Sequence, residues 1–291
     1  MPSLKEVKSR ITSVMSTQQI TKAMKMVAAA KLRKSQDRIM QMRPFSQKLS
    51  DLLANLSGAE MDGQTWYSRT GEEKKVLIVV VSSDRGLCGS FNSNIFKATT
   101  RLLVEKYAEQ QRKGNVTLLP IGKKAFEFFG KRNNPMINEY WNLFGTLSFE
   151  RTAAIADFLM DKFKAGEYDK IEIVYNEFKN VATQILRVEP FLPVVPTQQE
   201  VKANVDYLYQ PNQEEILTGL IPKSLRVQLY KSVLDSNASE NGARMTAMDK
   251  ATENAGELLK ELKLTYNRTR QAAITKEILE IVAGAEALKS A

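Results

Sequence analysis

The two ends of this chain are long helix-forming segments, and they constrain the fold more than any other feature. Residues 3–57 contain one proline, Pro44, and no glycine, and they are rich in Lys, Gln, Met, Ala and Leu, all good helix formers. From residue 4 to residue 56, positions spaced alternately by three and four residues are apolar at eleven of sixteen places. This spacing is typical of a coiled-coil seam. It predicts one helix of roughly 80 Å, in which Pro44 is a candidate position for a kink.

The C-terminal segment, residues 223–289, is predicted to be a second long helix. Pro222 suits a helix start, no proline follows it, and apolar residues recur at helical spacing. Three glycines each cost about 1 kcal/mol relative to alanine in a helix, and the stretch SNASENG at 236–242 is the weakest part of this prediction. Without interruption, the helix would be roughly 100 Å long.

Neither helix can bury its apolar stripe alone, which favours an antiparallel pair. If Leu56 lies near Lys223, then Leu4 falls near Thr275. Roughly the last fourteen residues would then project as a short amphipathic tip. An exposed apolar tip of this kind requires a hydrophobic socket in another protein.

The middle of the chain alternates strands and helices. Strands are predicted at 74–84, 116–122 and 168–178, and helices at 91–112, 123–132 and 150–166. This order favours a small Rossmann-like α/β domain. The predicted fold class is therefore a long antiparallel coiled coil plus an α/β domain, divided as 1–58 (N-terminal helix), 59–215 (α/β domain) and 216–291 (C-terminal helix).

The composition excludes several kinds of catalytic site. The chain has no histidine and one cysteine, Cys88. These counts exclude Ser-His-Asp triads, His and Cys-rich metal sites, and an internal disulfide framework. A single thiol is more often buried and inert than reactive. The longest strongly apolar run, Val76–Val81, is too short to span a bilayer, and the first residues show no secretory signal.

The net charge of +9 is concentrated in the first helix. Residues 3–57 carry eleven Lys or Arg and three Asp or Glu, whereas residues 58–222 carry twenty and twenty-one. A localised positive surface indicates an acidic protein, a nucleic acid or an anionic membrane as partner. Phe45 is the only aromatic residue in 3–57, which is unusual for proteins that stack on bases. A protein partner is therefore favoured over a solvated face, and a basic coiled-coil nucleic-acid-binding protein remains the alternative.

Two further stretches have both a structural and a functional interpretation. The loop Ser82–Asn92 follows a strand and precedes a helix, where a phosphate loop would lie, but it lacks the GxxxxGK[ST] and GxGxxG patterns. A tight turn using two glycines is favoured, although a small α/β enzyme with a pocket at Asp84–Asn92 stays open as a third hypothesis. The segment Arg268–Thr275 is either ordinary helix surface or a set of hydrogen-bond donors for a partner.

Three blocks closely resemble the gamma subunits of F-type ATP synthases. They are ITKAMKMVAAAKLRKSQ at 20–36, SSDRGLCGSFN at 82–92, and RMTAMDKATENAGELLKELKLTYNRTRQAAITKEILEIVAGAEAL at 244–288. The resemblance implies a central rotor shaft that couples rotation of the c-ring to conformational changes in a hexamer of three alpha and three beta subunits. It implies no catalysis by the chain itself, no cofactor and no metal, and it adds the epsilon subunit as a partner.

The resemblance also implies contact residues. A set on the first helix would face the lever of beta: Met24, Lys25, Lys31, Arg33 and Lys34. A set on the last helix would contact beta loops: Arg270, Gln271 and Thr275. Apolar residues of the tip would sit in the collar of the hexamer: Ile278, Ile281, Val282 and Leu288. The c-ring would meet the foot at Asp206, Tyr207 and Tyr209. Because no transit peptide and no cysteine pair in the middle domain are present, the chain resembles a bacterial or an already mature member of the family. The expected location is the cytoplasmic face of a bacterial inner membrane, as a peripheral protein.

Overall fold

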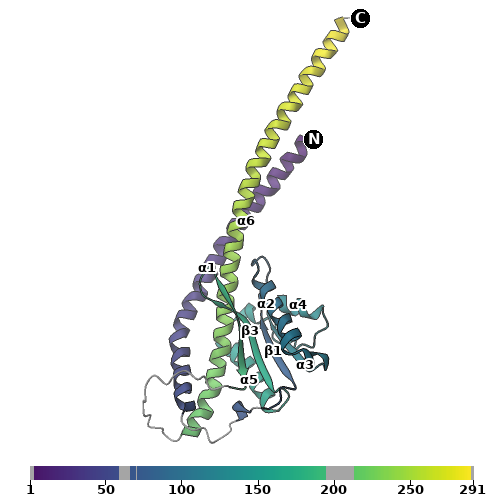
Figure 1. Ribbon diagram of the computed structural model, residues 1–291. Coiled ribbons are helices and arrows are strands. Elements are labelled where there is room, and N and C mark those ends of the chain that lie inside the picture. Colours follow the sequence, from purple (N-terminus) through teal and green to yellow (C-terminus); the bar gives the residue numbers. More distant parts are fainter. Residues whose placement is uncertain (1–2, 59–65, 70, 195–212, 290–291) are drawn as a thin grey trace. The chain divides into compact units, whose positions relative to one another are not determined.

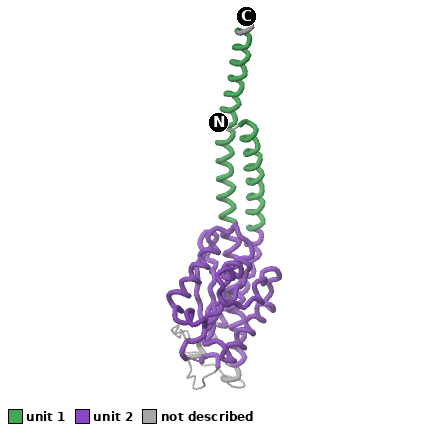
Figure 2. The backbone as a smooth tube through the Cα atoms, turned by 90° about the vertical axis from the view of Figure 1, so that its right-hand side faces the viewer, with its two compact units in different colours: residues 1–28, 245–291 green, residues 29–244 purple. Residues whose placement is uncertain are grey.

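A computed structural model describes residues 3–58, 66–69, 71–194 and 213–289 (Figure 1). Side chains are described throughout these ranges except at 50–58, 213–217 and 287–289. The chain divides into two compact units (Figure 2). One unit consists of residues 1–28 and 245–291, and the other of residues 29–244.

The N-terminal helix, α1, runs from Leu4 to Gly58 and includes Pro44. The burial of its side chains confirms the predicted coiled-coil seam. All fourteen seam positions from Leu4 to Leu49 are buried or half-buried. The C-terminal helix, α6, runs from Gln213 to Lys289, so Pro222 lies inside the helix rather than at its start. The predicted fold class is confirmed.

The unit of residues 29–244 contains a four-stranded sheet in the order β2-β1-β3-β4. Strands β1 (Val76–Val81), β2 (Val116–Ile121) and β3 (Lys170–Phe178) are parallel, with Val76 opposite both Val116 and Lys170. Strand β4 (Gln184–Leu192) pairs antiparallel to β3 at the edge. The first three strands were predicted from their apolar runs, and β4 was not.

Helices cover both faces of this sheet. One face packs against α5 (Phe149–Lys164) and against the α6 residues Ile221, Leu225, Leu229 and Val233. The other face packs against α2 (Phe91–Arg101) and α4 (Lys123–Gly130). Short 3-10 helices η1 (Trp66–Ser68) and η3 (Leu143–Thr146) complete the connections within the described residues. A strand buried on both faces reads as a continuous apolar run, and all six residues of β1 are buried.

The predicted helix at 91–112 is interrupted by a π-helical turn. After α2 the chain forms η2 (Leu102–Lys106) and then α3 (Ala108–Arg112). The Tyr107 amide donates to the Leu102 carbonyl at 2.9 Å, an i to i−5 bond. The turn places Lys106 in an ion pair with Glu172, a carboxylate of β3 that is only 3% exposed.

The polar stretch at 236–242 was expected to be the weakest part of the C-terminal helix, and this expectation is wrong. It is helical throughout, and all of its residues except Asn237 are buried. Small side chains permit this close packing. A β-carbon on Gly242 would lie 3.5 Å from the Phe178 ring and 3.6 Å from the Val181 carbonyl oxygen.

Candidate functional site: partner-binding surfaces of the terminal helices

In the unit of residues 1–28 and 245–291, α1 and α6 pack side by side (Figure 2). The predicted seam turns polar at Gln18, Thr21 and Lys25, and each of these side chains finds a polar partner on α6. Lys25 Nζ donates to Asp249 Oδ1 at 2.6 Å. Gln18 Nε2 donates to the Thr252 carbonyl oxygen at 3.4 Å, and the Thr252 hydroxyl donates to Thr21 Oγ1 at 2.8 Å. Because buried polar groups need partners, these contacts fix the register of the two helices.

That register differs from the predicted one. Val7 and Arg10 line a cleft of about 310 Å³ together with Leu262 and Thr265, whereas the prediction placed Leu4 near Thr275. The N-terminus of α1 therefore lies closer to the middle of α6, and the projecting part of α6 is longer than predicted. From Lys263 to Glu286, all residues are exposed except Tyr266, Thr269 and Ala273.

The projecting part of α6 carries the side chains predicted to contact a hexamer. Arg270, Gln271 and Thr275 are exposed, and the Thr275 hydroxyl donates to the Gln271 carbonyl at 2.9 Å. Three apolar residues of the tip are half or more exposed: Ile278 at 55%, Ile281 at 71% and Val282 at 50%. The side chain of Leu288 lies outside the described residues, as do Asp206, Tyr207 and Tyr209. A stripe this apolar and this exposed indicates a protein contact.

The cations predicted on α1 are not equivalent. Lys25 is already paired with Asp249 across the helix pair, and Met24 beside it is half-buried. In the other unit, Lys31, Arg33 and Lys34 are exposed, and no carboxylate of the described residues forms an ion pair with them. Among the four cations predicted to face beta, these three are therefore better placed than Lys25 to attract an acidic partner.

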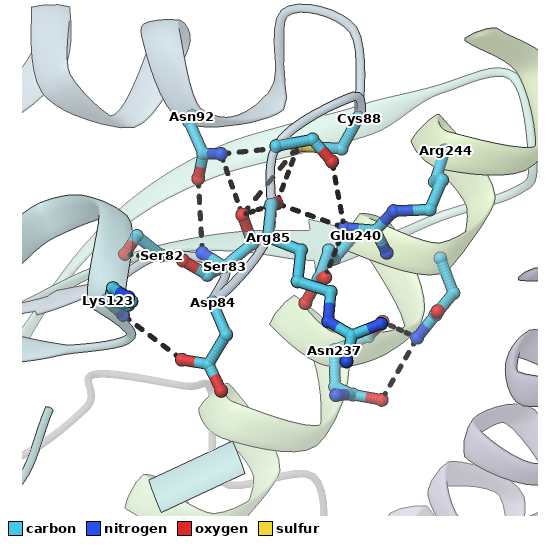
Figure 3. A network of polar contacts seen from close by, with 12 residues as sticks. Ser82, Ser83, Asp84, Arg85, Cys88, Asn92, Lys123, Asn237, Glu240 and Arg244 are labelled. Atoms are coloured by element: carbon cyan, nitrogen blue, oxygen red, sulfur yellow. Dashed lines mark hydrogen bonds and ion pairs between the residues drawn. The ribbon is translucent and has the colours of Figure 1, made fainter. Parts of the chain in front are cut away.

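The loop between β1 and α2 is held by its own side chains (Figure 3). The Ser83 amide donates to Asn92 Oδ1 at 3.1 Å, and Asn92 Nδ2 donates to Ser83 Oγ at 2.7 Å and to Cys88 Sγ at 3.3 Å. Ser83 Oγ in turn donates to the Arg85 carbonyl at 2.7 Å. The Ser83 and Asn92 side chains are thus occupied within the loop, which supports the interpretation as a tight turn.

The backbone of this turn differs in one detail from the expectation of two glycines. Gly89 has a φ of 57°, but the other left-handed residue is Leu87, with a φ of 61°. The Leu87 side chain is 65% exposed, whereas Cys88 is 2% exposed. Burial raises the pKa of the Cys88 thiol above its ordinary value. The prediction of a buried, inert thiol is confirmed in its burial, and a raised pKa lowers the reactive thiolate fraction.

Arg244 links this loop to α6 within the same unit (Figure 3). Its Nη2 donates to the carbonyls of Arg85 at 3.1 Å and Gly86 at 3.4 Å, and to Glu240 Oε1 at 2.6 Å. Burial raises the pKa of the Glu240 carboxyl, and the Arg244 guanidinium opposes that rise. Arg244 stands first in the block at 244–288, and no contact was predicted for it. Its i, i+4 spacing from Glu240 was the available signal.

Comparisons with known proteins cover the whole chain. Residues 3–288 match the family model described as ATP synthase. A relative from Cytophaga hutchinsonii, an ATP synthase gamma chain, is 56% identical over 100% of both chains, and one from Flavobacterium johnsoniae is 55% identical over 99% of both.

The chain belongs to the ATP synthase gamma chain family. The predicted resemblance is thereby confirmed, and nothing in the comparisons supports the nucleic-acid alternative. A solved structure from the central stalk and c-ring of the Tetrahymena thermophila mitochondrial ATP synthase is 28% identical, with a TM-score of 0.58 over 80% of this chain and 99% of that one. A rotor structure from Euglena gracilis, 21% identical with a TM-score of 0.66 over 93% and 98%, shares the gamma-chain fold. No helix among the described residues of this gamma-family chain is long and apolar enough to cross a bilayer.

Proposed function

We propose that this chain is the central rotor shaft of an ATP synthase and couples rotation of a c-ring to conformational changes in a hexamer of alpha and beta subunits. The observation that carries the proposal is the projecting part of α6, where Ile278, Ile281 and Val282 are 50–71% exposed. A single helix with this much exposed apolar surface needs an enclosing protein cavity. The collar of the hexamer would supply such a cavity, with Leu288 as a further contact.

The proposed contacts with beta fall into two groups. The cations Lys31, Arg33 and Lys34 on α1, with Met24 and Lys25 nearby, would face acidic segments of the beta lever. Arg270, Gln271 and Thr275 on α6 would bind beta loops. Both groups consist largely of exposed donors, so an acidic or carbonyl-rich surface complements them. A rotor transmits torque when such contacts favour one conformation of the partner over another.

We further propose that the chain performs no bond chemistry itself. It has no histidine, and in the loop between β1 and α2 the Ser83 and Asn92 side chains bond to each other and to the loop itself. Epsilon and the c-ring would complete its partners, with Asp206, Tyr207 and Tyr209 as the proposed c-ring contacts. The complex would place the chain as a peripheral protein at the cytoplasmic face of a bacterial inner membrane.

Charge reversal on α1 tests the coupling role. In membrane vesicles, Lys31→Glu, Arg33→Glu and Lys34→Glu together should lower ATP-driven proton pumping more than ATP hydrolysis. The coiled-coil seam stays intact, so the complex should still assemble. Because Lys31 lies within electrostatic reach of Glu240, a second variant changes only Arg33 and Lys34.

A matched control reverses three exposed cations of the α/β unit, Arg112, Lys113 and Lys179. Its pumping should equal that of the unmodified complex. Unchanged pumping in both α1 variants, in complexes of normal composition, would refute the proposed role of this basic face.

A further inference from the structure

A groove on the surface of the α/β unit lies between α2 with η2 on one side and α4 on the other. It has a volume of about 570 Å³, within the range of roughly 300–1,000 Å³ typical of small-molecule sites. The residues on the first wall recur at helical spacing from Ser93 to Glu105, and Phe128 and Arg132 form the opposite wall. None of these residues belongs to the partner contacts proposed above.

The floor of the groove is apolar. The rings of Phe96 and Phe128 stack with centroids 4.2 Å apart, and Phe129 packs edge-on against both, at 5.8 and 5.0 Å. Val104, in the π-helical turn, is 66% exposed and lines the same groove. A π-helical turn is an uncommon feature that often occurs at functional sites, and here it forms part of the groove wall.

The rim of the groove is positively charged. The Arg132 guanidinium lies 3.6 Å from the centroid of the Phe128 ring and donates one hydrogen bond to the Phe128 carbonyl, at 3.1 Å. No other partner of this guanidinium lies among the described residues, so its remaining N–H groups can donate to a ligand. Arg101 pairs with Glu105 at 2.7 Å, the one carboxylate among the lining residues. Together with Lys97, the lining therefore has three cations and one anion.

We propose that this groove binds a small amphipathic anion. The apolar body of the ligand would lie on Phe96, Val104 and Phe128, and its carboxylate, sulfonate or phosphate would accept hydrogen bonds from Lys97 and Arg132. The excess of cations favours an anion over a neutral or cationic amphiphile of the same shape. The stacked guanidinium, held in place by Phe128, presents a pre-organised donor set for such a group. This inference does not depend on the proposed rotor function.

Photolabelling of the assembled complex tests the proposal. The probe is decanoate with a photoreactive diazirine at its tail, and labelled peptides are located by mass spectrometry. Label is expected within residues 93–105 or 128–132. Excess decanoate should compete for this site, and decyltrimethylammonium, with the same tail and the opposite charge, should not. Label absent from these segments, or equal competition by both compounds, would overturn the proposal.

Paired variants separate charge from packing. Lys97→Met with Arg132→Met keeps an unbranched apolar stem at both positions and removes both charges, so labelling affinity should fall about tenfold or more. The control Lys113→Met removes an exposed charge of the same unit outside the groove and should leave labelling unchanged. Equal labelling in the double variant and the control, with normal ATP hydrolysis in both, would refute the charge argument. A photoreactive residue at position 104 that cross-links to another subunit would show that a protein segment fills the groove instead.

Discussion

The carboxyl group of Asp235 makes this fold sensitive to pH in a direction opposite to that of most carboxylates. Asp235 is 1% exposed, and neither of its oxygens has a hydrogen-bond partner among the described residues. Burial raises its pKa from 3.8 to about 6; Lys231 and Arg43 oppose this rise, and Glu177 and Glu189 add to it. The native state therefore holds a proton between these two pH values that the unfolded chain has lost.

The sign and size of the effect follow from proton linkage. Stability from the protonated carboxyl is fully present below pH 3.8 and is lost as the pH rises through about 6. The difference of 6 − 3.8 pKa units, at about 1.36 kcal/mol per unit, corresponds to a cost of about 3 kcal/mol at neutral pH. Asp235→Asn mimics the protonated acid without titrating. It should stabilise the chain by up to about 3 kcal/mol near pH 8 and by almost nothing near pH 4.

Urea unfolding of the full chain, followed by circular dichroism across this pH range, measures the effect. The matched control is Asp37→Asn, which neutralises an exposed aspartate of α1 in the same unit. Its stability should follow that of the unmodified chain at every pH. If the stability of Asp235→Asn relative to the unmodified chain did not change with pH, the raised pKa and the burial argument would both be refuted.

Three further substitutions test the packing of the α/β unit by the same unfolding measurement. Leu229→Ala removes a side chain that is 0% exposed and should cost about 3 kcal/mol. As a control outside that unit, the same change at Leu264, which is 60% exposed, should cost less than about 0.5 kcal/mol; equal losses would contradict the assigned core. Arg244→Ala leaves the buried Glu240 carboxylate uncompensated and should cost about 3 kcal/mol, and adding Glu240→Gln should restore much of this loss. Gly122→Ala would place a β-carbon 2.3 Å from the backbone oxygen of Ser82, at a φ of 105°, so it should lower the unfolding midpoint more than any surface change. An unchanged midpoint would show that the backbone of this loop moves to accommodate the β-carbon.

The sequence predicted what depends on regular spacing. Every seam position predicted for α1 is buried or half-buried where its side chain is described, because burial along a helix follows the helical period. The three parallel strands were found because strands buried on both faces are continuous apolar runs. Strand β4 was missed because its edge position allows exposed charged residues and a proline, Pro190, which weaken a strand pattern.

Spacing could not predict what depends on particular contacts. The register of the helix pair is set by polar contacts such as Lys25 with Asp249, and a length estimate contains no such information. The stretch at 236–242 is polar in composition, and it is buried where Gly242 comes close to Phe178 and Val181, far away in the sequence. The groove beside Val104 depends on the π-helical turn, for which the sequence offers no periodic signal.

The long exposed stretch of α6 has a thermodynamic consequence for assembly. Between Lys263 and Glu286 almost every side chain faces solvent, so little tertiary packing opposes the fraying of these turns in the free chain. Part of the association free energy must then be spent on suppressing that fraying. Affinity per unit of contact area should consequently be lower than for two rigid surfaces of equal size.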